Sequence, residues 1–233
     1  MNIVITGASS GVGRETAKIL AGIPGNRLMV IARNGMKIQA LSGECNIKRH
    51  ETVVQPLQFD LATGDMESLA HQINRQLGKI DVLINNAGAM LNKPVGKLTV
   101  SEVDTVFSVN VKAPLLLIQA LLPVMKPGSH IVNIGSMGGV QGSVKFPGLA
   151  AYSASKGALA VLTECLAEEL KDKQIAVNCL AFGAVQTEML AKAFPGYEAP
   201  VSAVKMAEFV ADFAINGHRY FNGKILPVSL STP

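Results

Sequence analysis

The sequence predicts an α/β fold in which a doubly wound parallel sheet carries helices on both faces. Short runs of apolar residues alternate along the chain with longer segments of helical periodicity. Strands that are apolar at every position are covered on both faces, as parallel sheets require. Hydrophobic residues make up 48% of the 233 residues and charged residues 16%, which excludes a disordered chain. We expect about seven strands in one domain, residues 1–233.

The first half of the chain alternates short buried strands with helices. Residues 14–21 and 66–77 repeat apolar side chains every three to four positions, which predicts amphipathic helices. The second of these ends near Gly78, and glycine commonly terminates helices. Residues 36–41 predict only a weak helix. Apolar runs predict strands at 3–5, 28–32, 53–59 and 82–84.

The second half begins with a long apolar helix, expected at 103–122. Pro114, near its middle, should kink or split it because proline lacks a backbone N–H. The helix is apolar on more than one face, so we expect the core or a partner subunit to bury it. The longest apolar stretch, 114–125, is too short to span a bilayer, which needs ~20 residues. Further helices are expected at 152–170 and 204–214, and strands at 131–134, 175–180 and 225–228.

Charge and cysteine content limit the compartment and the partners. The net charge of +4 is dispersed, which favours a mildly basic enzyme over a nucleic-acid-binding protein. Cys45, Cys165 and Cys179 form no CxxC pair, and no signal peptide is recognisable, so we expect free thiols and a cytoplasmic location. The histidines at 50, 71, 130 and 218 show no ligand spacing, and we expect no metal site.

A glycine-rich turn follows the first strand. Three glycines, spaced G-x3-G-x-G between Thr6 and Gly13, let the backbone turn tightly and approach a pyrophosphate at a helix N-terminus. The spacing differs from the usual G-x-G-x-x-G, and a purely structural turn is the alternative. Its position between strand and helix favours a dinucleotide site.

The end of the second strand indicates which dinucleotide is preferred. No Asp or Glu stands there to bind an adenosine ribose hydroxyl; the strand ends instead in Ala32-Arg33-Asn34. Arg33 can form charge-assisted hydrogen bonds with a ribose 2′-phosphate. This favours NADP(H) over NAD(H), the alternative being that Arg33 is a solvated surface charge.

Three further residues carry acid–base chemistry. Tyr152 and Lys156 lie four positions apart, on one face of a helix. A nearby ammonium lowers the pKa of a phenol from its reference value near 10, so Tyr152 would act as a general acid–base. Ser136 follows the fifth strand, where its hydroxyl can bond a substrate oxygen. Taken singly, each residue also fits a helix-surface pair or a turn serine.

Together these residues resemble the short-chain dehydrogenase/reductase family over essentially the whole chain. The family's TGxxxGxG and YxxxK match residues 6–13 and 152–156, and its NNAG matches residues 85–88. Its catalytic Ser and the Asn of its long fourth helix are matched by Ser136 and Asn110. The resemblance implies a Rossmann fold, NADP(H) as cofactor and no metal.

The resemblance also implies catalytic roles. Tyr152 would protonate the alkoxide, and Ser136 would orient the carbonyl. Lys156 would bind the nicotinamide ribose and lower the pKa of Tyr152. Asn110 would hold a water that connects Lys156 to solvent.

Other residues would contact the cofactor, among them a PGxVxT-like segment in which Phe182 replaces the proline. The expected contacts are Thr6, Gly7, Ser9, Ser10, Gly11, Val12, Gly13, Arg33, Asn34, Asp60, Leu61, Asn86, Ala87, Gly88, Tyr152, Lys156, Phe182, Gly183, Val185 and Thr187.

Two departures from the family pattern bear on the substrate. Ser136 and Tyr152 are sixteen positions apart, about three more than usual in the family, and we expect the glycine-rich loop 138–149 to shape specificity. The segment 188–199 is short where many members carry a helical lid, which suggests an open site. Apolar pocket residues are expected at Met90, Met137, Val140, Phe146, Leu149 and Met189, with Lys93 or Lys145 as the candidates for anion binding.

The resulting hypothesis is an NADPH-dependent carbonyl reductase, reversible as an alcohol dehydrogenase, that acts on a small-molecule ketone or aldehyde. An NAD-dependent alcohol dehydrogenase and a non-catalytic dinucleotide-sensing module are the alternatives. By resemblance we expect a homodimer or homotetramer, with neither nucleic acid nor membrane as a partner.

Overall fold

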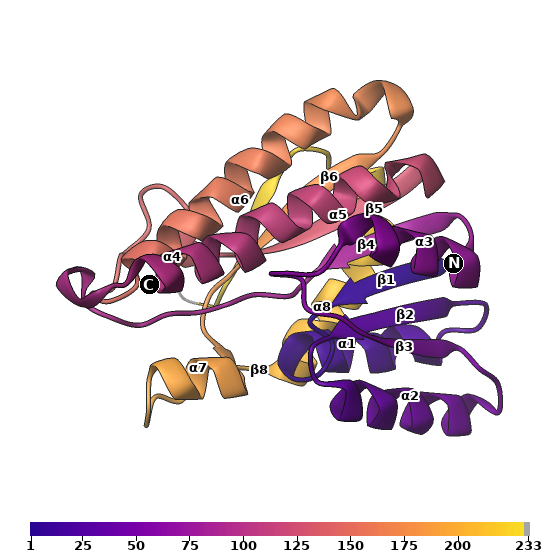
Figure 1. Ribbon diagram of the computed structural model, residues 1–233, viewed down its shortest axis with the longest axis horizontal. Helices are drawn as coiled ribbons and strands as arrows, with labels where there is room; N and C mark the ends of the chain where they lie inside the picture. The colour runs from indigo at the N-terminus through magenta and orange to yellow at the C-terminus, as the bar shows by residue number, and fades with distance from the viewer. Residues whose placement is uncertain (231–233) are drawn as a thin grey trace.

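Seven parallel strands form one sheet within residues 1–230, the part of the chain that the computed structural model describes (Figure 1). The order β3-β2-β1-β4-β5-β6-β9 reverses direction between β1 and β4, the switch point at which such sheets bind ligands. The predicted fold class is therefore confirmed. The strands are β1 (Asn2–Thr6), β2 (Arg27–Ala32), β3 (Val54–Gln58), β4 (Ile80–Asn85), β5 (Met125–Ser136), β6 (Ala176–Phe182) and β9 (Ile225–Val228).

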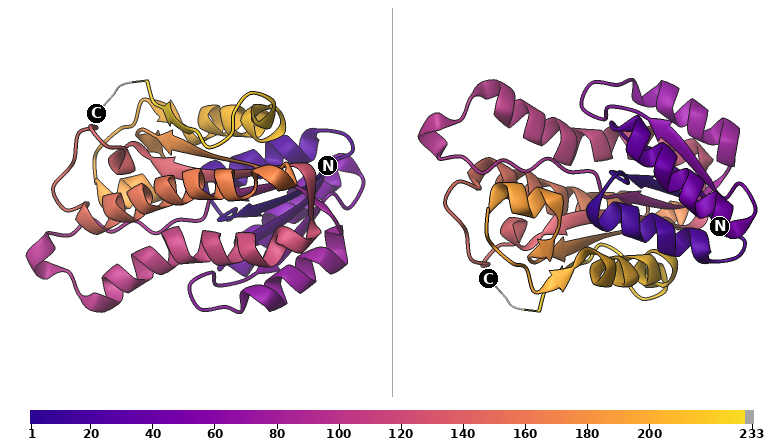
Figure 2. Two further views of the ribbon diagram at one scale, coloured as in Figure 1. Left: turned by 90° about the horizontal axis from the view of Figure 1, so that it is seen from above. Right: turned by 90° about the horizontal axis from the view of Figure 1, so that it is seen from below.

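Helices cover both faces of the sheet (Figure 2). Side chains of Ile3 and Ile5 on β1 pack into the core on one face, whereas Val4 packs into the core on the other. This alternation explains why the central strands are apolar at every position. One face carries α1 (Gly11–Gly22), α2 (Gly35–Arg49) and α8 (Ala203–Asn216), and the other carries α3 (Met66–Leu77), α5 (Ala113–Leu121) and α6 (Ala150–Glu169).

The long apolar helix is split, as the proline predicts, but the irregularity lies ahead of it. α4 (Val100–Phe107) and α5 are joined by the π-helical turn η2 (Ser108–Lys112). Pro114 has no N–H to donate to the carbonyl of Asn110, four residues earlier. By length and composition alone, Val100–Val124 could cross a membrane. One such helix is weak evidence for a membrane span, because core helices of soluble proteins can have the same length and composition.

Three segments differ from the sequence expectation. β5 begins at Met125, six residues before the strand expected at 131–134. The Asn34 side chain caps the start of α2, and the helix runs to Arg49 rather than ending near position 41 because its buried stripe continues through Ser42 and Cys45. Between β6 and α8 the chain forms three short elements that the sequence did not predict. These are β7 (Val185–Gln186), α7 (Glu188–Ala193) and β8 (Val201–Ser202).

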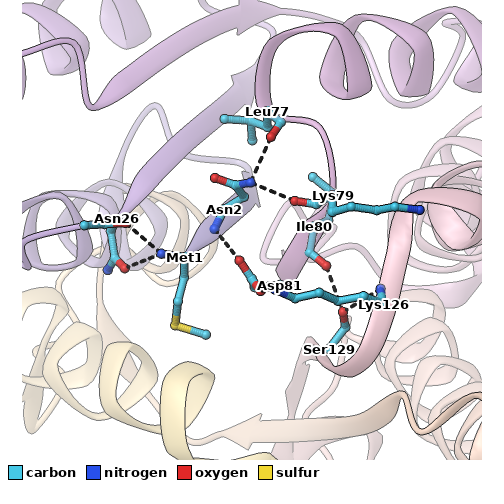
Figure 3. Close-up of polar contacts among 10 residues, drawn as sticks. Met1, Asn2, Asn26, Leu77, Lys79, Ile80, Asp81, Lys126 and Ser129 are labelled. Atoms are coloured by element: carbon cyan, nitrogen blue, oxygen red, sulfur yellow. Dashed lines mark hydrogen bonds and ion pairs between the residues drawn. The ribbon is translucent and has the colours of Figure 1, made fainter.

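A polar network links the amino-terminal ends of three central strands (Figure 3). The backbone N–H of Asn2 on β1 donates to Asp81 Oδ2 on β4 (2.6 Å), and Lys126 on β5 pairs with the same carboxylate. Ser129 Oγ on β5 donates to the carbonyl of Ile80 (2.8 Å). These contacts fix the strands at the edge opposite to the site, so that their carboxyl ends meet in register.

Candidate active site

A cavity of about 1730 Å³ opens at the carboxyl ends of the strands. Its lining comes from the segments that follow β1 to β6 and from α7, which lies apart from the sheet at the left of Figure 1. All the predicted site residues line it except Thr6, Gly13 and Asn110, which lie behind its wall. Segments far apart in the sequence thus converge on one site.

The glycine-rich turn is held by the loop that follows β4. Asn86 Nδ2 donates to the carbonyls of Thr6 and Gly7 (3.0 Å each), and Ala87 N donates to Thr6 Oγ1 (3.1 Å). A Cβ on Gly13 would lie 2.2 Å from Asn86 Nδ2, so only glycine fits there. No side chain caps the N-terminus of α1, whose first-turn amides therefore remain able to bind an anion. The turn fits a dinucleotide pyrophosphate.

Arg33 lines the cavity directly after β2, in a region that we call the adenosine end. It is exposed, lines the cavity and has no hydrogen bond or ion pair within residues 1–230. Asn34 also lines this end, but its side-chain oxygen accepts from Lys37 N (3.0 Å) and so caps α2. Asp60 Oδ1 accepts from Ala62 N (2.9 Å). A free guanidinium at this position fits a ribose 2′-phosphate.

Sequence reasoning missed Gln58, which lines the adenosine end. Gln58 pairs in register with Ala32, the last residue of β2 and the neighbour of Arg33. The signal was its position at the end of the third strand, since neighbouring strand ends meet at the same edge of a parallel sheet.

Tyr152 and Ser136 both line the cavity and lie within hydrogen-bond reach of each other. Tyr152, on the first turn of α6, is 8% exposed. Burial raises the pKa of its phenol, and a hydrogen bond with Ser136 opposes that rise only in part. The predicted lowering of this pKa by Lys156 is therefore not seen. Ser136 Oγ also accepts from Gly138 N (3.1 Å), which fixes the hydroxyl at the end of β5.

Lys156 lies one turn further along α6, buried beside Tyr152. Its Nζ donates to the carbonyl of Ile134 on β5 (2.7 Å). Burial lowers the pKa of its ammonium to about 8. A Cβ on Gly88 would lie 3.6 Å from Lys156 Nζ and 3.5 Å from Asn110 Oδ1, so both groups surround this bare glycine.

Asn110 supports the site from behind. Its Oδ1 accepts from Ala89 N (2.8 Å), and its Nδ2 donates to Ala89 O and Ser155 Oγ (2.9 Å each). The side chain thus joins η2 to the loop after β4 and to α6. Its water-holding role stays a prediction.

The loop after β5 lies directly against α6. A Cβ on Gly139 would lie 2.5 Å from the backbone carbon of Lys156 and 2.6 Å from Gly157 N. This close approach needs glycine at position 139 and holds Ser136 next to Tyr152. The sequence showed a glycine-rich loop here but gave no sign of which glycine touches the helix.

The segment from β6 to α8 covers the cavity. Phe182, which replaces the family's proline, is 9% exposed and lines the wall. α7 is tied at both ends: Glu188 pairs with Lys37 of α2 (3.2 Å), and Asn92 Nδ2 donates to Ala193 O (2.8 Å). The short segment expected to leave the site open thus carries a small tethered helix.

Metal binding and disulfide formation have no support among the described residues. Within the described residues, no group of three or more His, Cys, Asp or Glu side chains could hold a metal ion. All three cysteines are free, as predicted, with Cys165 exposed and the other two buried.

Comparison with known proteins supports the family resemblance seen in the sequence. The family model described as short chain dehydrogenase matches residues 1–198. Carbonyl reductase (NADPH) 2 of Sus scrofa is 35% identical over 193 residues, which cover 81% of this chain and 73% of that protein. Dehydrogenase/reductase SDR family member 7B of Mus musculus is 35% identical over 192 residues, 80% of this chain but only 58% of that relative's length. A short chain dehydrogenase from Burkholderia cenocepacia J2315, solved in complex with NADP, superposes with a TM-score of 0.85 at 26% identity, covering 97% of this chain and 95% of that one.

Proposed function

The chain belongs to the short-chain dehydrogenase/reductase family of oxidoreductases, and from that premise we propose that it is an NADPH-dependent carbonyl reductase. Its substrate is a ketone or an aldehyde, and the reaction is reversible as an alcohol dehydrogenase. One observation carries the proposal: the Tyr152 hydroxyl, Ser136 and Lys156 meet in the same cavity that holds the glycine-rich turn and an unpaired Arg33.

NADPH is the cofactor that the cavity fits. The uncapped N-terminus of α1 receives the pyrophosphate, and Arg33 receives the 2′-phosphate. The NADP bound by the Burkholderia cenocepacia structure and the name of the Sus scrofa relative support this choice. When bound, NADPH supplies the hydride that reduces the carbonyl carbon.

The side chains of this chain handle the proton. Because burial keeps the Tyr152 pKa high, the phenol is protonated at neutral pH and donates its proton to the developing alkoxide. Ser136 donates a hydrogen bond to the same oxygen and so orients the carbonyl. Lys156, with a pKa of about 8, is held by Ile134 O, where it would bind the ribose hydroxyls of the cofactor and return a proton toward Tyr152.

The test follows NADPH oxidation at 340 nm with a panel of aldehydes, ketones, diketones and quinones. Tyr152→Phe is expected to lower kcat/KM by at least ~100-fold, because general acid catalysis contributes that much. NADPH binding should persist, and Tyr220→Phe, which alters a 79% exposed tyrosine, serves as the matched control. NADPH binding without turnover of any carbonyl would favour the sensing module instead.

Arg33→Ala tests the choice of cofactor. Loss of a charge-assisted bond to the 2′-phosphate should weaken NADPH binding by about 10- to 100-fold and leave NADH binding unchanged. A native enzyme that prefers NADH would identify an NAD-dependent alcohol dehydrogenase.

A further inference from the structure

Apolar side chains from three segments form part of the cavity wall, which we assign to the substrate and call the substrate end. Met90 from the loop after β4, Phe146 from the loop after β5, and Leu190 and Phe194 from the α7 segment all line it. Within residues 1–230, Arg33, Asp60 and Lys156 are the charged side chains that line the cavity. The first two lie at the adenosine end, so Lys156 is the one charge near the reacting carbon.

The two lysines expected to bind anions are held elsewhere. Lys93 Nζ binds both carboxylate oxygens of Glu102 (2.8 Å each), and Glu102 also accepts from the N–H and hydroxyl of Thr99 at the start of α4 (2.9 Å each). Neither Lys93 nor Glu102 lines the cavity. The ion pair is therefore part of the helix cap and not of the pocket.

Lys145 is satisfied within its own loop. Its Nζ donates to the carbonyls of Val140 (2.6 Å) and Ser143 (3.2 Å) and to Ser143 Oγ (2.6 Å). Neither Lys145 nor Val140 lines the cavity, although the sequence suggested both. Thr105, a hydroxyl residue that does line it, donates to the carbonyl of Ser101 on its own helix (2.8 Å).

An anionic group at the substrate end would lose its hydration, and the one cation near it is Lys156, whose ammonium is already bound to Ile134 O and is assigned to the cofactor; this is unfavourable. An apolar group would instead exchange water for methionine, leucine and phenylalanine side chains. Resting on the reductase function proposed above, we propose that the substrate is an uncharged ketone or aldehyde with a bulky apolar group beside the carbonyl. Carbonyl compounds that carry a carboxylate or phosphate on that side are rejected.

A matched pair of ketones tests the proposal, with NADPH as reductant and acetophenone as reference. Methyl 4-acetylbenzoate and 4-acetylbenzoate share a ring and a reacting ketone and differ in charge. We expect kcat/KM for the ester to exceed that for the acid by about 100-fold, because the buried charge stays unpaired. An acid reduced as well as the ester would overturn the inference and leave the reductase function intact. Failure of every carbonyl in the broader panel would instead refute the reductase function.

A designed cation provides the reverse test. Leu190→Arg places a guanidinium in the substrate end, whereas Ala191→Arg adds the same charge at an exposed position of α7 outside the cavity. The ester-to-acid ratio of kcat/KM should fall at least tenfold in Leu190→Arg and stay native in Ala191→Arg. NADPH binding by both variants checks that they fold. Equal ratios in the two variants would overturn the assignment of this end to the substrate's apolar group.

Discussion

A buried histidine makes the stability of this fold depend on pH. His130 on β5 is fully buried between the sheet and α8. Its Nδ1 lies 3.0 Å from the carbonyl of Ala214, in the last turn of α8, and its Nε2 lies 3.1 Å from Asn178 Nδ2 on β6. Lys224 N donates to Asn178 Oδ1 (3.1 Å), which fixes the amide with its N–H toward the ring. The neutral imidazole therefore donates from Nδ1 and accepts at Nε2, and protonation would set two donors against each other.

The size of the effect follows from the pKa of His130. Burial lowers this pKa to about 4 from 6.5; the bond to Ala214 opposes the shift, and His218 adds to it. Because the folded pKa is the lower one, the unfolded chain binds more protons below pH 6.5, and stability is lost as the pH falls from 6.5 toward 4. At ~1.36 kcal/mol per pH unit the full difference is about 3 kcal/mol, of which about 2 kcal/mol is lost by pH 5.

Urea unfolding at pH 7.5 and pH 5.0, followed by circular dichroism at one protein concentration, measures this loss. Between these two pH values, the free energy of unfolding should fall by about 2 kcal/mol more in the native protein than in His130→Gln. His71→Gln, at an exposed position of α3, should keep the native pH dependence. The same decrease in the native protein and in His130→Gln would refute the reasoning.

Three further predictions concern the cofactor, the α7 segment over the cavity (the lid) and assembly. Gly13→Ala should weaken NADPH binding at least tenfold in a fluorescence titration, because its Cβ would collide with the Asn86 amide; Gly43→Ala, with open space around it, should bind normally. Asn92→Ala removes the bond to Ala193 and should raise KM for the ketone about fivefold, the value of one hydrogen bond, with kcat little changed. Unchanged steady-state kinetics would show that this tether does not hold the lid. We also expect light scattering to show the native chain as a dimer or tetramer. Val161→Glu, which places a charge at a 59% exposed position on α6, should lower the mass of that assembly. A monomer mass for the native chain would contradict the predicted oligomer.

Much of the fold followed from local patterns in the chain. Apolar strands and amphipathic helices set the order of the elements, and residues 66–77 and 225–228 were predicted with the bounds that the structure has. The glycine-rich turn and the Tyr152–Lys156 pair were visible because their chemistry depends on spacing along a single element. Arg33 could be predicted as a candidate phosphate-binding residue because it is a basic residue at the end of a strand.

The partners of individual side chains were decided only by the tertiary structure. The sequence could not show that Lys93 pairs with Glu102, or that Lys145 folds back onto its own loop, because side-chain partners depend on which segments meet. Nor could it show that burial raises the pKa of Tyr152, since burial is a property of the packed molecule. The sequence by itself determined the order of the main elements and the family, and it predicted the reacting residues. The tertiary structure decided which charges remain free, because only folding fixes which groups lose water and which find a partner.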